Sequence, residues 1–321
     1  MSKPDILAVT RLHPFYLAHL QSAYTVHDRL HETDPAAFEQ VAPKIVGVAA
    51  SGESRVPRDL LTRLPQARVV AVFGVGYDGV DVAASLECGI PVTHTPEVLT
   101  DDVADLAMGL VLSVARGIPQ ADRHVRDGRW PQGPFALARK VSGARMGIVG
   151  LGRIGSAIAA RAQAFGMSIA YTARSEKPDS GFKYFADAVS LAAQVDFLVA
   201  ITPGGAGTRH LINEQVLKAL GPRGFLINVA RGSVVDEQAL LNALQQGVIA
   251  GAGLDVYENE PHVPQAFWSL ANVVLTPHMA SGTHETRQAM ADLAFANLQA
   301  GVEGKPLRTP VPEWMARLQG G

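Results

Sequence analysis

The chain has 321 residues and a formal net charge of −2, and 47% of its residues are hydrophobic, 6% aromatic and 18% charged. This composition excludes a disordered chain, and the length suits two domains of ordinary size. The near-neutral charge, without any Lys/Arg-rich block, argues against binding to nucleic acid or to an anionic membrane.

The N-terminal residues MSKPDILAVT lack the apolar segment of a signal peptide, and no apolar run reaches the length of a membrane span. We therefore expect a cytoplasmic protein. The single cysteine, Cys88, excludes an internal disulfide and fits a reducing compartment. It precedes Gly89 at a predicted helix end, and we interpret it as a small packing residue.

Short apolar runs rich in β-branched residues recur along the chain without strict alternation, as in strands buried on both faces of a parallel sheet. Helical segments such as DLLTRLP, SAIAARAQAFG and VVDEQALLNALQQG lie between them. This alternation predicts an α/β fold with right-handed crossovers. In chain order, the predicted strands are 6–9, 45–50, 69–74, 90–94, 146–150, 167–172, 196–201, 224–230, 251–256 and 273–278.

A glycine-rich sequence, GLGRIG, occupies residues 150–155, and four predicted strands precede it. We therefore expect residues 1–98 to form a βα lobe of their own. A long helix is predicted from Thr100, where Thr-Asp-Asp supplies a capping hydroxyl and two acids in the first turn. Another helix, at about 283–302, could fold back on the first lobe. The proline-rich tail GKPLRTPVPEW after it is predicted to be extended.

GLGRIG lies between a predicted strand and an Ala-rich helix, which is the context of a dinucleotide-binding fingerprint. Gly150 allows the tight turn, Gly152 lets a pyrophosphate approach the backbone, and Gly155 permits close packing of helix on strand. The free N–H groups at the start of the helix would hold the phosphates. The alternatives are a glycine turn that binds nothing and one that binds S-adenosylmethionine.

The sequence YTARSEK follows about 20 residues later, where an NAD-binding protein carries an acid for the ribose hydroxyls. Thr172 stands at that position, and Arg174 and Ser175 follow it. Arginine pairs bidentately with phosphate and stacks on adenine, and Lys177 is a second possible cation. The missing acid predicts NADP(H) rather than NAD(H), and solvated loop charges are the alternative.

Three polar residues come at the ends of predicted buried strands, where open α/β sheets bind their ligands. Arg231 follows FLINVA, Glu260 lies beyond GLDV, and His278 closes VVLTPH. Arginine can grip a carboxylate, histidine can exchange a proton near neutral pH, and a carboxylate behind the imidazole orients it. Each residue alone could be a surface or capping residue, but together they predict hydride transfer to a 2-oxo acid.

The chain resembles the D-isomer-specific 2-hydroxyacid dehydrogenases over nearly its whole length, in the segments GLGRIGSAIAARAQAFG, NVARGSVVDEQALLNAL, AGLDVYENEP and LTPHMASGTHETR. The resemblance implies that Arg231, Glu260 and His278 are the catalytic trio. It also implies a Rossmann doubly wound cofactor domain, residues 99–284, inserted in a flavodoxin-like substrate-binding domain, residues 1–98 and 285–321.

The stretch VFGVGYDGVD is similar to the family's substrate loop. This implies that the backbone N–H groups of Val75 and Gly76 hold the substrate carboxylate, with Tyr77 beside them and with Arg231 and His278 completing the site. No metal ligand is expected. The implied cofactor contacts are Gly150, Leu151, Gly152, Arg153, Ile154, Gly155, Ala173, Arg174, Ser175, Thr202, Pro203, Thr208, Val229, Ala230, Asp255, His278, Ser281 and Gly282.

Within the family, YTARS and LTPHMASGTHETR are most similar to the glyoxylate/hydroxypyruvate and hydroxyphenylpyruvate reductases, which prefer NADPH, and the 2-ketogluconate reductases are also similar. The resemblance implies that a small 2-oxo acid enters a cleft between the domains and leaves as a D-2-hydroxy acid. It also implies a homodimer, with Thr100 to Trp130 supplying much of the interface.

Leu99, Trp130, Phe135 and the segment around Tyr77 could wall the substrate pocket. Two other readings of the same resemblance stay open. One is a dinucleotide-sensing scaffold similar to the C-terminal-binding-protein corepressors, and the other is a formate or phosphite dehydrogenase.

Overall fold

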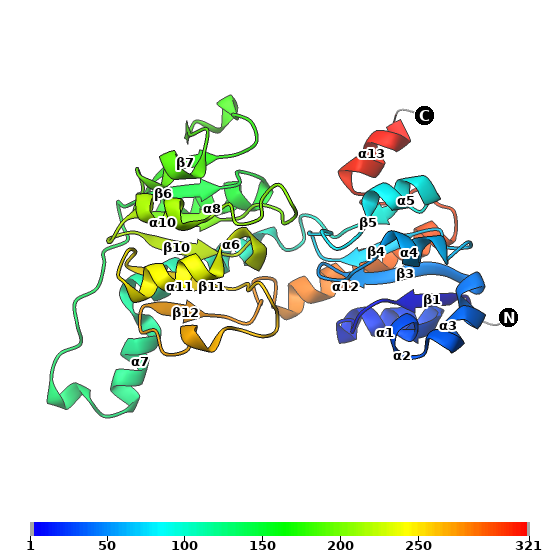
Figure 1. Cartoon of the computed structure of the whole chain (residues 1–321), viewed down its shortest axis with the longest axis horizontal. Coiled ribbons are helices and arrows are strands. Elements are labelled where there is room, and N and C mark those ends of the chain that lie inside the picture. The colour runs from blue at the N-terminus through cyan, green and yellow to red at the C-terminus, as the bar shows by residue number, and fades with distance from the viewer. Residues whose placement is uncertain (1–2, 320–321) are drawn as a thin grey trace. The chain divides into compact units, whose positions relative to one another are not determined.

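The structure, a computed structural model, describes residues 3–319, which divide into two units. The first unit runs to Leu99 and resumes at Thr283, and the second comprises Thr100–Gly282. Each unit is an α/β fold in which helices pack on one parallel sheet (Figure 1).

The first unit contains a five-stranded parallel sheet in the order β2-β1-β3-β4-β5, which is the flavodoxin-like order. Its strands are β1 (Asp5–Ala8), β2 (Thr25–Asp28), β3 (Ile45–Ser51), β4 (Val70–Phe73) and β5 (Val92–Thr93). Its helices are α1 (Pro14–Ala23), α2 (Leu30–Thr33), α3 (Pro35–Val41), α4 (Arg58–Thr62), α5 (Val82–Cys88), α12 (His284–Val302) and α13 (Pro312–Gln319).

The second unit contains a seven-stranded parallel sheet in the order β12-β11-β10-β9-β6-β7-β8. Counted from β6, this is the doubly wound Rossmann order with one further strand beyond it. Its strands are β6 (Arg145–Val149), β7 (Ser168–Thr172), β8 (Lys183–Tyr184), β9 (Phe197–Ala200), β10 (Phe225–Asn228), β11 (Gly251–Leu254) and β12 (Val273–Leu275). Its helices are α6 (Thr100–Arg116), α7 (Ile118–Arg126), α8 (Arg153–Ala164), α9 (Ala188–Ala192), α10 (Glu214–Leu220) and α11 (Glu237–Gln245).

Each strand predicted from an apolar run is present at least in part, and the central strands β9 and β10 are buried at every residue. Full burial of each large apolar side chain in such strands contributes about 1.5–3 kcal/mol. Two strands were not predicted. β2 (TVHD) carries no apolar run, and β8 has only two residues.

The C-terminal part of the chain completes the first unit, because α12 packs against α1, β3 and β4. The prediction that GKPLRTPVPEW is extended is wrong at its end, since α13 begins at Pro312. Proline suits the first turn of a helix, where its missing N–H has no partner to lose. The interpretation of Cys88 as a packing residue is also wrong, because this last residue of α5 is exposed.

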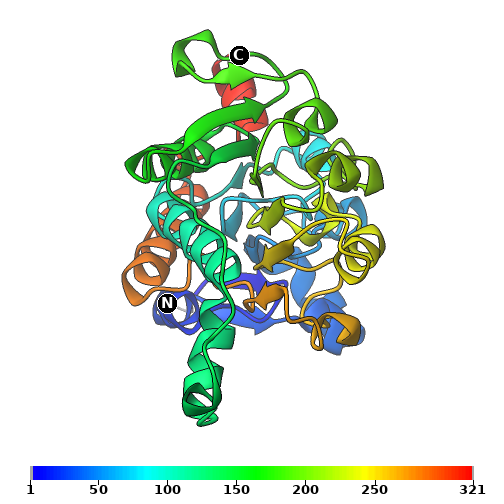
Figure 2. The ribbon, with the colours of Figure 1, turned by 90° about the vertical axis from the view of Figure 1, so that its left-hand side faces the viewer.

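The segment of residues 117–140 extends away from the body of the second unit (Figure 2). We call it the arm. It contains α7, which has no buried residue, and it exposes large apolar side chains. Trp130 and Phe135, proposed above as pocket walls, both lie on the arm, where Phe135 packs its ring against that of His124. Over residues 3–319, no helix combines the length and the apolar character needed to cross a bilayer.

Candidate active site

The glycine turn connects β6 to α8, and two of its glycines are required by the fold itself. Gly150 has φ +107°, and a Cβ there would lie 2.7 Å from the carbonyl oxygen of Ile201. A Cβ at Gly155 would lie 2.3 Å from the carbonyl oxygen of Gly150. Any other residue at either position would force the turn or the helix away from the sheet.

Gly152 differs from these two glycines, because a Cβ at this position would meet no atom of the chain within 4 Å. Its φ of −93° is also open to any residue. Packing of this chain therefore does not explain a glycine here, whereas the close approach of a ligand would. Gly152 is the N-cap of α8, and no side chain caps that helix. The first N–H groups of α8 are thus suited to bind the pyrophosphate of a dinucleotide.

The YTARSEK loop after β7 is closed by the buried side chain of Tyr171. Its hydroxyl accepts a hydrogen bond from the Lys177 N–H at 2.6 Å and lies 3.2 Å from the Lys177 carbonyl oxygen, to which it donates. The ammonium of Lys177 donates to the carbonyl oxygen of Leu151, inside the glycine turn. Lys177, considered above as a phosphate ligand, is therefore a link between the two loops.

Arg174 and Ser175 occupy the exposed part of this loop, and Thr172 is buried at the end of β7. Within residues 3–319 the guanidinium of Arg174 has no ion-pair partner. The only acid of YTARSEK, Glu176, is exposed beyond Ser175. The loop therefore presents a cation and a hydroxyl, which suits a phosphate better than a neutral ribose.

Three adjacent strands, β10, β11 and β12, carry the predicted trio on the loops that follow them. His278 Nδ1 and Glu260 Oε2 are 2.6 Å apart, and Glu260 Oε1 accepts a hydrogen bond from the Tyr257 N–H at 2.8 Å. The carboxylate is thus fixed on both oxygens and orients the imidazole. Arg231 is half-buried and donates from Nη1 to the Ala230 carbonyl oxygen at 2.7 Å.

His278 has a left-handed backbone, with φ of 50°, which is unfavourable for a residue with a side chain. The buried carboxylate of Asp255 holds this turn. It accepts hydrogen bonds from the Thr276 hydroxyl at 2.6 Å and from the N–H groups of Met279 and Ala280, both at 2.9 Å. The Asp255 carbonyl oxygen accepts the His278 N–H at 2.8 Å. Asp255 was predicted as a cofactor contact, and this structural role could not be predicted from the sequence.

The loops of Arg231 and Glu260 are locked together by backbone contact. A Cβ at Gly232 would lie 1.9 Å from the carbonyl carbon of Tyr257, so the two chains touch there. Glu237, at the start of α11, accepts the Glu258 N–H at 2.7 Å. Glu258 is not a plain exposed turn acid. Its side chain is largely covered and pairs with Arg209 at 2.6 Å.

The remaining predicted cofactor residues follow the neighbouring strands of the second unit. Val229 and Ala230 are buried directly after β10. Thr202 is buried after β9, and the hydroxyls of Thr202 and Thr208 both donate to the Pro203 carbonyl oxygen at 2.7 Å. Ala173 is half-buried after β7, and Ser281 and Gly282 close the second unit after His278. Contact of these residues with a cofactor remains a prediction.

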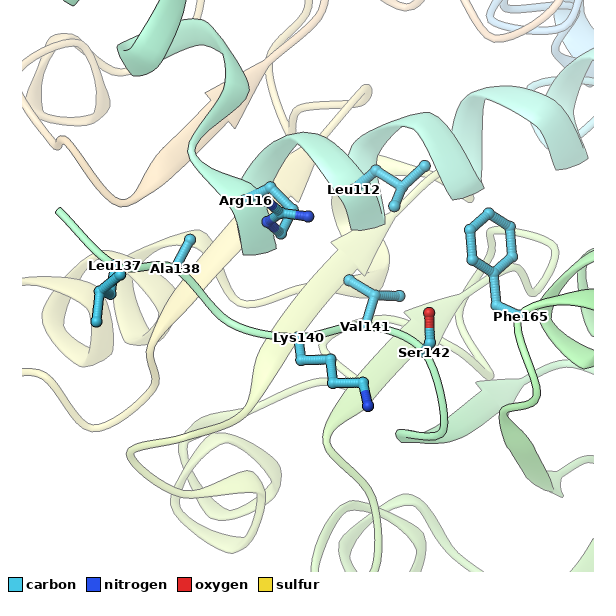
Figure 3. Close-up of a pocket in the computed structure, with 8 residues that line it drawn as sticks. All are labelled: Leu112, Arg116, Leu137, Ala138, Lys140, Val141, Ser142 and Phe165. Atoms are coloured by element: carbon cyan, nitrogen blue, oxygen red, sulfur yellow. The ribbon is translucent and has the colours of Figure 1, made fainter. Parts of the chain in front are cut away.

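A cavity of about 380 Å³ in the second unit contains none of the predicted site residues. It lies between the C-terminal half of α6, the end of the arm and the residues that join the arm to β6 (Figure 3). Its lining includes Leu112, Arg116, Leu137 and Phe165. Because it has no part in the strand-end site, we do not assign it to the substrate.

A glycine turn on a Rossmann sheet, together with a paired imidazole and carboxylate at the strand ends, defines a dinucleotide-dependent oxidoreductase. The profile of the D-isomer specific 2-hydroxyacid dehydrogenase, NAD binding domain, matches residues 108–280. The chain belongs to the family of D-isomer-specific 2-hydroxyacid dehydrogenases.

Its relatives include several reductases. The chain is 50% identical over 270 residues to hydroxyphenylpyruvate reductase of Plectranthus scutellarioides, covering 84% of this chain and 86% of the relative. It is 51% identical over 267 residues to glyoxylate/hydroxypyruvate reductase A HPR2 of Arabidopsis thaliana, covering 83% of this chain and 84% of the relative. It is 43% identical over 310 residues to 2-ketogluconate reductase of Gluconobacter oxydans, covering 97% and 99%.

Among solved structures, the chain is similar to the NADPH-dependent glyoxylate/hydroxypyruvate reductase of Sinorhizobium meliloti, crystallised with NADP and malonate. The TM-score is 0.90 and the sequence identity 47%, covering 97% of this chain and 98% of that chain.

Glu237 gives a prediction about stability and pH. Its burial, followed by the nearby charges of Glu258 and Glu260, raises its pKa above the ordinary value of 4.5. Because the folded pKa lies above the unfolded one, ionised Glu237 costs stability, and the cost grows as pH rises from 4.5 through the folded pKa. Glu237→Gln keeps an acceptor for the Glu258 N–H without the charge. We expect its melting temperature to exceed that of the wild type most at about pH 8, with the difference shrinking toward about pH 5.

Thermal unfolding followed by circular dichroism across this pH range measures the difference. Glu214→Gln, at an exposed glutamate paired with Lys218 on α10, is the matched control and should show no such gain. A melting temperature of Glu237→Gln equal to that of the wild type at every pH would contradict the conclusion that ionised Glu237 costs stability.

Proposed function

We propose that the protein is an NADPH-dependent reductase that converts a small 2-oxo acid, glyoxylate or hydroxypyruvate, into the D-2-hydroxy acid. The observation that carries the proposal is the 2.6 Å contact between His278 Nδ1 and Glu260 Oε2, at the strand ends of a dinucleotide-binding sheet. The names of the Arabidopsis and Sinorhizobium relatives support the choice of substrate.

In the proposed mechanism, Arg231 binds the substrate carboxylate and the adjacent keto oxygen with its fork of N–H donors. When bound, the reduced dinucleotide supplies the hydride for the keto carbon. His278 donates the proton from Nε2 to the keto oxygen, so that one hydride and one proton together give the hydroxy acid. Glu260 stabilises the imidazolium through Nδ1–H and keeps Nε2 directed at the substrate. Val75 and Gly76 belong to the first unit, and their part in carboxylate binding is included in the proposal.

The preference for NADPH rests on the YTARSEK loop. Arg174 and Ser175 are exposed on it, and Thr172 stands where an acid would repel a 2′-phosphate. The Tyr171 and Lys177 contacts hold the loop against the glycine turn. Arg174 would then bind the 2′-phosphate of a dinucleotide whose pyrophosphate binds at Gly152. That the similar Sinorhizobium structure contains NADP supports the same choice.

Two other substrates deserve a direct test, because hydroxyphenylpyruvate reductase and 2-ketogluconate reductase are both relatives. Oxidation of NADPH with a panel of glyoxylate, hydroxypyruvate, hydroxyphenylpyruvate and 2-ketogluconate ranks the four by kcat/KM. Failure to reduce any of them would overturn the proposal and favour the dinucleotide-sensing scaffold.

The acid role of His278 predicts the behaviour of His278→Ala. Loss of a positioned general acid lowers kcat by about a hundredfold or more, because the keto oxygen must then take its proton from water. Steady-state NADPH oxidation measures the loss. His262→Ala, at an exposed histidine of the loop after β11, is the control and should keep wild-type turnover. Near wild-type kcat in His278→Ala would rule out His278 as the general acid.

Arg174 should determine the choice between the two coenzymes. We expect Arg174→Ala to raise the KM for NADPH about tenfold or more, the value of one charge-assisted hydrogen bond, and to leave the KM for NADH nearly unchanged. The comparison is kcat/KM for both coenzymes with one oxo acid. Arg223→Ala serves as the control, because this exposed arginine precedes β10 and thus lies at the N-terminal ends of the parallel strands, whereas Arg174 lies at their C-terminal ends. A wild type that uses NADH better than NADPH would refute the preference.

We also propose a homodimer formed through the arm, with α6 and α7 in the interface. Ile118 is 50% exposed, Val125 55%, Trp130 66% and Leu137 104%, so the arm presents an apolar surface that a second copy could cover. Light scattering should give about twice the chain mass of 34.0 kDa, and Leu137→Asp should shift the mass to that of one chain. Leu318→Asp, at an exposed leucine of α13, should stay dimeric. A monomeric wild type would contradict the proposal.

A further inference from the structure

The loop that follows β4, residues 74–77, is held from one side by the segment that follows β5. The Gly74 carbonyl oxygen accepts the Thr95 N–H at 2.8 Å, and the Gly74 N–H donates to the Thr95 hydroxyl oxygen at 3.0 Å. The Val75 carbonyl oxygen lies 2.8 Å from Nδ1 of His94. Two successive carbonyl groups of the loop are therefore bound by two successive residues, His94 and Thr95.

The contact of His94 fixes its protonation at Nδ1. A carbonyl oxygen can only accept a hydrogen bond, so Nδ1 must carry the proton and donate it to Val75. The His94 side chain is buried, with 9% of the residue exposed, and the Tyr77 ring meets it edge-on at a centroid distance of 5.4 Å. The imidazole thus has a fixed position and a fixed role as donor.

This arrangement determines the direction of two backbone N–H groups. The peptide bonds of the loop are trans, so each carbonyl and the N–H of the following residue point in opposite directions. With the Gly74 and Val75 carbonyls turned to segment 94–95, the N–H groups of Val75 and Gly76 point away from it. Within residues 3–319, neither of these N–H groups donates a hydrogen bond. Successive N–H groups presented in this way attract an anion.

His94 is itself positioned by the C-terminal part of the chain. Its N–H donates to the Thr309 carbonyl oxygen at 3.1 Å, and its carbonyl oxygen accepts the Thr309 hydroxyl at 2.6 Å. The fully buried Asn297 of α12 donates to the Thr309 hydroxyl oxygen at 2.7 Å and accepts the Thr309 N–H at 3.1 Å. A continuous set of hydrogen bonds therefore links α12 to the loop of residues 74–77.

We propose that His94 is a positioning residue for the substrate: by holding the Val75 carbonyl through Nδ1–H, it directs the Gly76 N–H at the carboxylate of the 2-oxo acid. The inference rests on the proposed function and concerns the substrate-binding amides of the first unit. His94 does not touch the substrate in this account. Its effect is confined to how well the loop presents its amides to an anion.

Three substitutions separate this role from simple packing. In asparagine, Nδ2 is bonded to Cγ, as Nδ1 is in histidine, so His94→Asn can restore the donor to the Val75 carbonyl. His94→Gln places its amide nitrogen one bond further out, and His94→Leu has no donor. We expect the KM for glyoxylate to rise about tenfold in the Leu variant, less in the Gln variant and little in the Asn variant. The KM for NADPH should stay within about twofold in all three, because the coenzyme is held by the second unit.

The inhibition constant of oxalate against glyoxylate provides a readout of anion binding that is independent of turnover. It should rise in the same order, Asn, Gln, Leu. Wild-type turnover with an unchanged KM and oxalate inhibition constant in His94→Leu would overturn this inference alone. An Asn variant whose KM for glyoxylate and oxalate inhibition constant are no lower than those of the Gln variant would also overturn it. This comparison tests the inference even where the Leu variant does not fold. A wild type that reduces no 2-oxo acid would overturn the proposed function and the inference with it.

Discussion

The geometry of the candidate site depends on the buried carboxylate of Asp255. A histidine in a left-handed backbone conformation is strained, and the strain persists only where the surrounding structure leaves no alternative. Asp255 supplies that constraint, because its carboxylate accepts two N–H groups and one hydroxyl of the turn around His278. The imidazole can then meet Glu260, which is itself held by the Tyr257 N–H. The proposed proton donor is therefore placed by the Asp255 carboxylate, which binds the backbone of this turn, and by Glu260.

Much of the fold could be predicted from the sequence, because in a parallel sheet buried on both faces each strand is an apolar run. The Rossmann order and the flavodoxin-like order followed from the family resemblance, and both are present. The failures have local causes. The strand TVHD has polar residues at three of its four positions, and it pairs at the edge of its sheet, where burial is incomplete. The final helix was missed because Pro312 was taken as a sign of extended chain, although it begins that helix.

The candidate site was predictable to the extent that it follows strand ends. Arg231, Glu260 and His278 were singled out from their positions and side-chain chemistry and from the family resemblance, and the structure brings two of them within hydrogen-bond distance. The supporting contacts were not predictable, because they join residues distant in sequence through the backbone. His94 reaches Val75 across 19 residues, and Glu237 reaches the backbone of the Glu258 loop across 21. A pattern of residue types along the chain contains no information about such a contact.

The interruption of the first unit by the second has a consequence for how the chain folds during synthesis. The second unit is one continuous stretch, so all of it has been made before α12 leaves the ribosome. The first unit must wait, since α12 covers α1, β3 and β4 and contributes buried residues such as Ala291, Ala294 and Leu298. Until translation reaches that helix, the apolar face that α12 covers stays exposed on the N-terminal lobe.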